Sequence, residues 1–140
     1  MGNTSSVNKI NYEDLIFLSN KNNCILINTL PPSMQDCLII NTTIATEEEN
    51  IINSYLKTDQ RKTIIIYGKN CNDETIFKKY QQLNDLGFNN INIYTGGMFE
   101  WLLLQDIYGS EDFPTTIVER DHLKFKGRSM FTTYMIRDLD

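Results

Sequence analysis

Short apolar runs bounded by polar residues recur along the chain and predict strands. Three of them, at residues 24–28 (CILIN), 37–41 (CLIIN) and 63–67 (TIIIY), are unbroken, and the last is rich in β-branched side chains. Residues 90–94 (NINIY) instead alternate between polar and apolar side chains. Unbroken runs are typical of strands buried on both faces, and alternation is typical of strands with one buried face. We therefore expect a strand at each of these places, most strongly at 63–67.

Helical patterns separate the predicted strands. Residues 12–18 form a short apolar stretch that Asn11 can cap, and the carboxylate of Asp14 falls near the positive end of that helix. At the start of a second helix, Thr46 can act as the cap, and Glu49 can reach back to the amide of that cap. The sequence thus predicts where both helices begin.

Two further helices are predicted together with their ends. Apolar side chains repeat every three or four residues over 76–86, and Gly87 is well placed to end that helix in the left-handed conformation. The segment 98–108 (MFEWLLLQDIY) follows a Gly-Gly turn and ends at Gly109. Its large side chains cannot all face one core, which indicates a contact surface for a protein partner or for a second copy of the chain.

Strands that alternate with helices over short connections predict an α/β fold with a mostly parallel central sheet flanked by helices. In such sheets ligands bind beyond the carboxyl ends of the strands. The polar loop after residues 63–67 lies at such an end and contains Cys71. This loop is therefore the first place to expect a functional site.

The two ends of the chain lack these patterns. Residues 1–9 are mostly polar and predict a flexible arm, in which Gly2 and Ser6 match the pattern for N-myristoylation. A single acyl chain binds membranes weakly, so we expect weak and reversible membrane association. Residues 110–140 mix charges with scattered apolar side chains and predict an extended tail with one docked amphipathic turn. Residues 10–109 remain as the folded domain.

Composition narrows the functional classes. The 140 residues fit one domain, and no apolar run reaches the roughly 18 residues that a membrane span needs. The net charge of -5, with 13 scattered basic residues, argues against nucleic acid as a ligand.

The cysteines indicate the compartment. Cys24, Cys37 and Cys71 form no Cys-x-x-Cys pair, and no secretory signal precedes them. We expect a reduced, cytoplasmic setting, with no metal site and no cofactor. Cys24 and Cys37 lie within apolar runs and are expected to be core residues.

Several segments together resemble a single-domain rhodanese. They are the strand and loop IIIYGKNC, the helix end QQLNDLGF, and the strand, double glycine and tryptophan of NINIYTGGMFEW. The specific part of the resemblance is 67–101, and the match as a whole covers about 10–109. The resemblance implies a three-layer rhodanese-like domain with sulfurtransferase activity.

Rhodanese chemistry gives a role to a cysteine in such a loop. The thiolate attacks the outer sulfur of a small sulfur donor, becomes a persulfide, and passes that sulfur to a thiol or to cyanide. Backbone amides of the loop and the positive end of the following helix hold the anion. The resemblance thus implies Cys71 as the candidate nucleophile, the amides of residues 72–76 as its cradle, and Lys69 as a source of positive charge.

The loop departs from the family in register and in charge. The family's nucleophile usually follows the tyrosine of the strand directly, where this chain has Gly68. Counting back from the LGF motif puts the expected cysteine near Asn70, so Cys71 is displaced from both places. The family commonly carries an arginine in the loop that attracts an anionic sulfur donor. This loop instead carries Asp73 and Glu74, whose carboxylates repel an anionic donor.

The candidate residues of the loop also have a structural interpretation. Besides Cys71, the candidates are Gly68, Lys69, Asn70, Asn72, Asp73, Glu74 and Thr75. Of these, Asn70, Asn72 and Asp73 are well suited to form turns and cap helices. Elsewhere, Asn28 and Leu30 stand where the family usually has an Asp-x-Arg, which implies that an ion pair is absent there.

Two functions follow from these observations. The first is a sulfurtransferase that carries a persulfide on Cys71. The alternative is a catalytically inactive rhodanese-like binding module, tethered to a membrane through a myristoyl group on Gly2, whose protein partner or second copy contacts the 98–108 helix or the C-terminal tail. Phosphatase chemistry is disfavoured because its Cys-x5-Arg loop would need an arginine at Phe77. The single histidine, His122, lies in the tail, so no Cys-His pair is expected.

Overall fold

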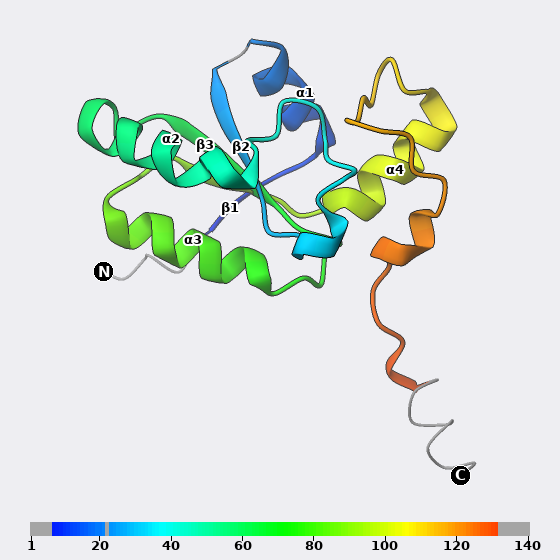
Figure 1. Ribbon diagram of the computed structural model, residues 1–140. Helices are drawn as coiled ribbons and strands as arrows, with labels where there is room; N and C mark the ends of the chain where they lie inside the picture. Colours follow the sequence, from blue (N-terminus) through cyan, green and yellow to red (C-terminus); the bar gives the residue numbers. More distant parts are fainter. Residues whose placement is uncertain (1–6, 22, 132–140) are drawn as a thin grey trace.

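A parallel sheet forms the centre of the protein (Figure 1). The computed structural model describes residues 7–21 and 23–131. Within this part, the sheet has four parallel strands in the order β1-β4-β3-β2. They are β1 (Asn8–Ile10), β2 (Cys24–Asn28), β3 (Thr63–Tyr67) and β4 (Ile91–Tyr94). The strands predicted at 24–28, 63–67 and 90–94 are confirmed as β2, β3 and β4.

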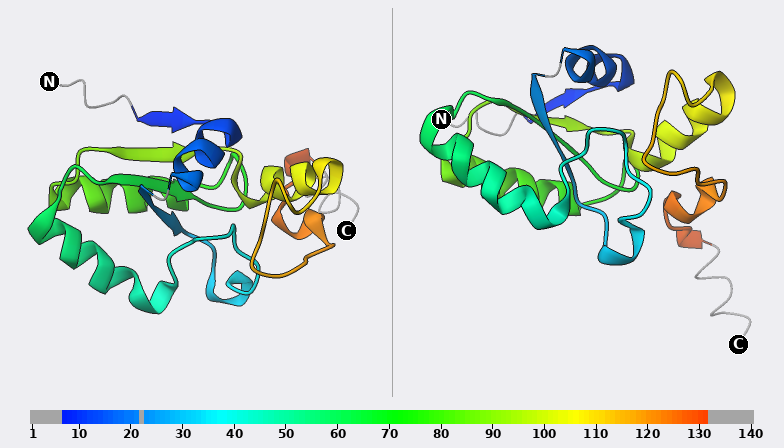
Figure 2. Two further views of the ribbon diagram at one scale, coloured as in Figure 1. Left: turned by 90° about the horizontal axis from the view of Figure 1, so that it is seen from above. Right: turned by 45° about the horizontal axis from the view of Figure 1, so that its top comes forward.

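Helices cover both faces of this sheet, which gives the molecule three layers (Figure 2). On one face lie α2 (Ala45–Thr58) and α3 (Thr75–Leu86), and on the other lie α1 (Tyr12–Asn20) and α4 (Gly97–Tyr108). Two 3-10 helices lie in connecting segments, η2 (Pro32–Met34) and η3 (His122–Phe125). The predicted fold class, α/β with a parallel sheet flanked by helices, is confirmed.

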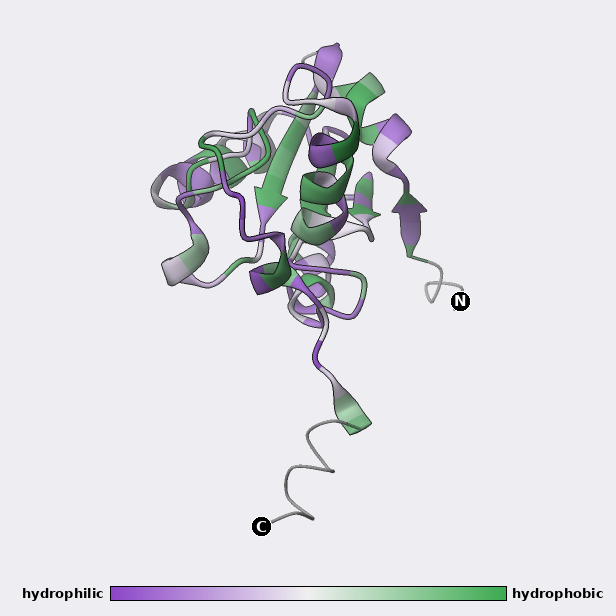
Figure 3. Cartoon of the chain, turned by 90° about the vertical axis from the view of Figure 1, so that its right-hand side faces the viewer, coloured by the Kyte–Doolittle hydropathy of each residue, from purple (hydrophilic) through white to green (hydrophobic). Residues whose placement is uncertain are grey.

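Burial on both faces explains the unbroken apolar run of β3. Ile64 and Ile66 pack in the core beneath α2 and α3, whereas Ile65 and Tyr67 pack in the core shared with α1 and α4. All four side chains are fully buried. Successive side chains of a strand point to opposite faces, so a strand covered on both sides favours apolar residues throughout. By contrast, the edge strand β1 is polar and is purple in Figure 3.

Three of the predicted helix ends are confirmed, at Asn11, Gly87 and Gly109, and one is wrong. The side chain of Asn11 accepts a hydrogen bond from the amide of Asp14, whose carboxylate accepts one from the Asn11 amide, so α1 begins with a capping box. Gly87 ends α3 with a φ of 114°, which glycine adopts without strain. Thr46 is not the cap of α2, because the helix already begins at Ala45 and Thr46 lies inside its first turn.

The predicted strand at 37–41 is wrong. Its residues form no ladder in the described chain, and Ile39 makes an isolated antiparallel bridge to Thr115. The amide of Ile39 donates instead to the hydroxyl of Tyr67 at 3.1 Å. The run is apolar because Cys37, Leu38 and Ile39 are buried in the core. Its composition therefore reflects burial and not strand pairing.

Both ends of the described chain contribute to the fold. Asn8 and Lys9, which the sequence assigned to a flexible arm, belong to β1 and pair with β4. Beyond α4, Phe113 packs edge-on against Trp101, with the ring centroids 5.1 Å apart. Phe125 in η3 is fully buried, so the docked turn expected in the C-terminal tail is present. The folded part of the chain thus extends beyond both ends of the predicted domain.

The apolar helix α4 divides its side chains between two environments. Met98, Trp101 and Leu102 are buried in the core. Ile107 and Tyr108 are 68% and 62% exposed. The structure therefore confirms that not all of this helix faces inwards, while a partner or dimer contact on its outer side stays a prediction.

Two membrane-related expectations have different outcomes. Among residues 7–21 and 23–131, the helices are all too short or too polar to span a bilayer. The myristoylation pattern at Gly2 and Ser6 lies outside the described residues.

Candidate functional site

The loop after β3 lies beyond the carboxyl end of a central strand, where the sequence placed the site. It spans residues 68–74, between β3 and α3. The start of α4 holds its first half in place: the amide of Met98 donates to the carbonyl of Gly68 at 2.9 Å, and the amide of Phe99 donates to the carbonyl of Lys69 at 2.8 Å. The loop is therefore anchored by a neighbouring helix as well as by its own strand.

Close packing against this loop explains the second glycine of the Gly-Gly turn. Gly97 has a φ of 67°, in the left-handed region that other residues rarely adopt. A Cβ on Gly97 would lie 2.7 Å from the carbonyl oxygen of Gly68 and 2.9 Å from the amide nitrogen of Asn70. Any side chain at this position would therefore push the loop away from α4.

The carboxylate of Asp73 occupies the inside of the loop. Its Oδ2 accepts a hydrogen bond from the amide of Lys69 at 2.8 Å, and its Oδ1 accepts from the amide of Thr75 at 3.0 Å and from the Thr75 hydroxyl at 2.6 Å. Partial burial raises the pKa of Asp73, but the hydrogen bonds from Thr75 and Lys69, with the nearby Lys69 charge, lower the pKa by more. Asp73 is therefore ionised at neutral pH, and the loop supplies its own anion.

Asn70 ties the loop together from its other side. Its buried side chain accepts from the amide of Asn72 at 2.9 Å and donates to the carbonyl of Phe125 at 2.8 Å. Its carbonyl accepts from the amide of Asp73 at 3.2 Å. Four amides thus have acceptors within the loop, namely those of Lys69, Asn72 and Asp73 in the loop and that of Thr75 at the start of α3. These four donors are not free to hold a bound anion.

The cysteines differ in their surroundings. Cys71 is on the exposed side of the loop, with its Sγ 3.9 Å from Asn72 Oδ1. Cys37 is buried, and Cys24 is half-buried against the core. Burial raises the pKa of both of these thiols, which keeps them protonated and unreactive. Cys71 is therefore the accessible thiol among the three.

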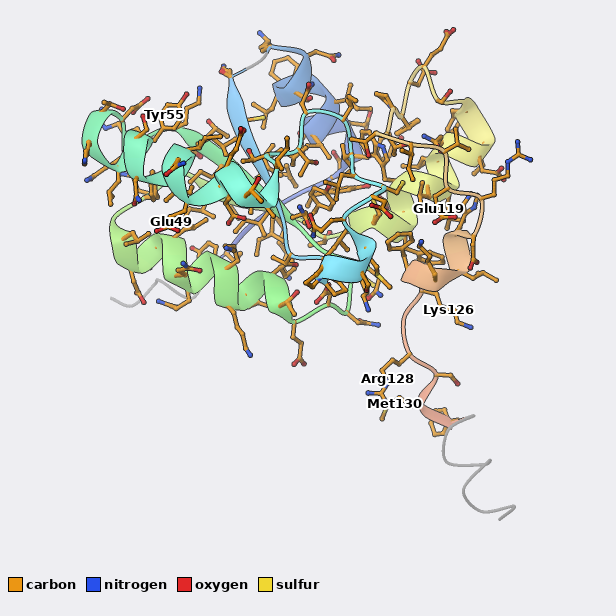
Figure 4. The ribbon with its side chains drawn as sticks, viewed as in Figure 1. Glu49, Tyr55, Glu119, Lys126, Arg128 and Met130 are labelled. Carbon is orange, nitrogen blue, oxygen red and sulfur yellow. The ribbon has the colours of Figure 1, made fainter. Side chains whose placement is uncertain are left out.

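An open groove of about 1030 Å³ lies beside the loop. The loop lines it from Lys69 to Thr75, and Phe77 of α3 continues this lining. The segment after η3 contributes Lys126, Arg128 and Met130, which are labelled in Figure 4. The groove is thus built from parts of the chain that are far apart in sequence.

Sequence reasoning missed the contribution of the C-terminal segment to this groove. Lys126 has an extended backbone, and every second residue from Lys126 to Met130 lines the groove. Lys126, Arg128 and Met130 follow that spacing. The alternation was visible in the sequence, but nothing in the sequence places this segment against a loop about 50 residues earlier.

A family comparison agrees with this architecture. The model of the Rhodanese-like domain family matches residues 39–104, which include β3, the loop, α3, β4 and most of α4. The chain contains a rhodanese-like domain. The resemblance based on residues 67–101 is confirmed. No curated protein matches the chain in sequence.

Solved structures share the fold of this rhodanese-like domain at low sequence identity. The Alr3790 protein from Anabaena sp. is 17% identical, with a TM-score of 0.55 over 93% of this chain and 90% of that one. The solution NMR structure of the Rhodanese-like domain from Alr3790 is 16% identical, with a TM-score of 0.57 over 89% and 90%. The BH2092 protein from Bacillus halodurans is 14% identical, with a TM-score of 0.57 over 88% and 93%. At these identities the likeness establishes the fold alone.

In the rhodanese-like loop, the Asp73 carboxylate occupies the space beside Gly68, the position where the family usually has its nucleophile. A Cβ on Gly68 would overlap the Asp73 carboxylate, lying 2.9 Å from its Cγ, and would lie 3.0 Å from Thr29 Oγ1. A side chain at this usual place would therefore have to displace the carboxylate from its hydrogen bonds.

A neutral network stands where the family usually has an Asp-x-Arg. The side-chain oxygen of the buried Asn28 accepts from the amide of Leu30 at 3.0 Å and from the side-chain amide of Gln35 at 2.8 Å. Gln35 also donates to the carbonyl of Leu30 at 2.8 Å. Uncharged amides therefore hold this turn, with no ion pair.

Proposed function

We propose that this chain is a rhodanese-like binding module and that its loop is not used for sulfur transfer. The observation that carries the proposal is the position of Asp73. Its carboxylate accepts hydrogen bonds from Lys69 and Thr75 inside the loop, where a persulfide carrier needs donors for a sulfur anion. Because the Asp73 carboxylate already fills the loop, the loop is suited to present a fixed binding surface and not to hold a reacting sulfur group.

Electrostatics supports this proposal. A persulfide or an anionic sulfur donor would have to approach the ionised Asp73 and the exposed Glu74. Like charges within a few ångströms repel each other most strongly where solvent is excluded. Lys69 is the loop's counter-charge, and it already lies near enough to Asp73 to lower the pKa of that carboxyl group. The net field inside the loop is therefore unfavourable for a second anion.

A sulfurtransferase that uses Cys71 is the competing function. Two observations favour it, since Cys71 is exposed and lines the groove together with Lys69. Against it, the amides of Asn72, Asp73 and Thr75, which should cradle a persulfide, are bonded to Asn70 and Asp73. The two functions differ in whether Cys71 is needed for turnover.

The test is an assay of thiocyanate formation from thiosulfate and cyanide. We expect the wild-type protein and Cys71→Ser to form thiocyanate at the rate of the buffer alone. A rhodanese with known activity, assayed in parallel, shows that the reagents work. Turnover by the wild-type protein that is lost in Cys71→Ser would establish the sulfurtransferase and overturn the proposal.

The tether is a separate part of the proposed function and rests on Gly2. We propose that the module is cytoplasmic and is held weakly at a membrane by a myristoyl group. Co-expression with an N-myristoyltransferase should give a protein whose intact mass includes one myristoyl group, and Gly2→Ala should lack it. An unmodified wild-type protein under these conditions would remove the tether from the account.

A further inference from the structure

Three cationic side chains line the groove beside the loop. They are Lys69 from the loop and Lys126 and Arg128 from the segment after η3. The ion pairs among the described residues are those of Lys79 with Glu48 and of Lys124 with Glu119. The three groove cations therefore have no ion-pair partner within residues 7–21 and 23–131, although the chain as a whole has a net charge of -5.

The carboxylates of the groove do not cancel these cations. Both oxygens of Asp73 accept hydrogen bonds within the loop. Glu74 is exposed and is the other carboxylate in the groove lining. Three cations against two carboxylates leave the groove with a net positive charge, although the Asp73 carboxylate still opposes an anion placed at the loop amides.

Apolar side chains accompany the cations. Phe77 of α3 is 44% exposed and Met130 is 65% exposed, and both line the groove. Methionine is a flexible side chain that adapts to the shape of a bound apolar group. The groove thus offers positive charge and an adaptable apolar contact side by side.

We propose that this groove binds an acidic, extended peptide segment that carries an apolar side chain. The carboxylates of the peptide pair with Lys69 and Arg128, and its apolar side chain contacts Phe77 and Met130. This inference rests on the proposed function as a binding module and names the chemistry of its partner. The groove is concave and is as large as the biggest small-molecule pockets, about 300–1,000 Å³, which suits several residues of a peptide. A flat anionic membrane would reach the rim of such a groove and not its interior.

The test is fluorescence anisotropy with labelled synthetic peptides of about eight residues. One peptide has alternating glutamates around a central leucine, and its partner peptide has glutamine at every glutamate. We expect the acidic peptide to bind more tightly, and its affinity to fall as sodium chloride is added. The variant Lys69→Gln/Arg128→Gln should bind the acidic peptide about three- to tenfold more weakly, since two exposed ion pairs are lost.

A matched control separates specific pairing from a change in net charge. The variant Lys9→Gln/Lys57→Gln removes the same charge from exposed positions that do not line the groove, and it should bind like the wild-type protein. Equal affinity for the acidic and neutral peptides, equal losses in both double variants, or no binding of either peptide would overturn the inference. Binding to anionic phosphatidylserine vesicles that needs Lys69 and Arg128, without peptide binding, would overturn it in favour of a lipid surface.

The failure of this inference is distinguishable from the failure of the proposed function. Loss of peptide selectivity leaves the thiocyanate assay unaffected, so the loop remains non-catalytic. Turnover that depends on Cys71 removes the proposed function whatever the peptides do.

Discussion

Asp73 decides the chemistry of the loop at the scale of single residues. Its carboxylate takes the hydrogen bonds of Lys69 and Thr75 and occupies the space that a side chain at Gly68 would need. One side chain thus both accepts the hydrogen bonds of the loop and competes for space with any side chain at Gly68. The two effects make predictions that can be measured separately.

The first prediction concerns the coupling between Gly68 and Asp73. Asp73→Ala should cost about 1–2 kcal/mol of unfolding free energy, since charge-assisted hydrogen bonds to the loop are lost. Gly68→Ala should cost a similar amount because its methyl group displaces the carboxylate. In the Asp73→Ala background, Gly68→Ala should change stability by less than about 0.5 kcal/mol. Urea unfolding of the wild-type protein, the two single variants and the double variant measures this double-mutant cycle. Additive losses of stability would show that the two positions do not compete for space.

The second prediction concerns pH. The pKa of Asp73 in the folded protein lies below the value of about 3.9 expected for an unfolded chain. A lowered folded pKa stabilises the protein above the unfolded pKa, and this contribution is lost as the pH falls through the folded pKa. The stability difference between wild type and Asp73→Ala should therefore be constant from pH 7 to pH 5 and shrink below about pH 4. A difference that persists or grows in acid would mean that the carboxylate is not held as an anion.

At the scale of elements, the α4 start and the loop form one unit. The amides of Met98 and Phe99 hold the loop carbonyls of Gly68 and Lys69, and Gly97 permits the close approach. The short turn between β4 and α4 is therefore as important to the site as the loop itself.

The third prediction compares two glycines with positive φ. Gly97→Ala should destabilise the protein by more than Gly87→Ala, because both suffer a positive-φ backbone cost of about 1 kcal/mol but only Gly97→Ala also pushes against the loop. A Cβ on Gly87 would make only an ordinary contact, 3.6 Å from the side-chain oxygen of Gln60. Thermal and urea unfolding measure both variants, and equal losses would show that the contact between Gly97 and the loop carries no energy.

Much of this level of structure could be predicted from local patterns. The β-branched run of 63–67 was sufficient to predict β3, and Gly87 was sufficient to predict the end of α3. In both cases the residue types themselves favour the local structure, whatever the rest of the chain does. The strand predicted at 37–41 failed because burial alone gives the same apolar composition as a buried strand. The strand β1 was missed because only Ile10 of its three residues is apolar, so an edge strand looks like a polar arm.

At the scale of the whole molecule, the C-terminal segment is part of the site. Phe125 is fully buried against the core, and its carbonyl accepts a hydrogen bond from Asn70 of the loop. Lys126 and Arg128 follow directly and line the groove. The location of the site could be predicted from the end of β3, whereas these long-range contacts depend on the fold and leave no local pattern.

The fourth prediction tests this docking. Phe125→Ala should cost about 3–5 kcal/mol of unfolding free energy, as expected for a fully buried aromatic side chain. Its neighbour Leu123 is 61% exposed, and Leu123→Ala should change stability by less than about 0.5 kcal/mol. Hydrogen exchange should also show faster exchange of the Asn72 and Asp73 amides in Phe125→Ala, because a segment that no longer docks moves the backbone carbonyl of residue 125 away from Asn70. Similar stability of both variants would mean that the segment does not dock on the domain.

The central claim is that the loop carries no persulfide, and the mass of the protein tests it directly. The reduced wild-type protein and Cys71→Ser are incubated with thiosulfate, separated from the donor, and measured by intact-mass spectrometry without reductant. The account predicts that both proteins keep the mass of the unmodified chain. A wild-type protein that gains the mass of one sulfur atom, with no gain in Cys71→Ser, would contradict it.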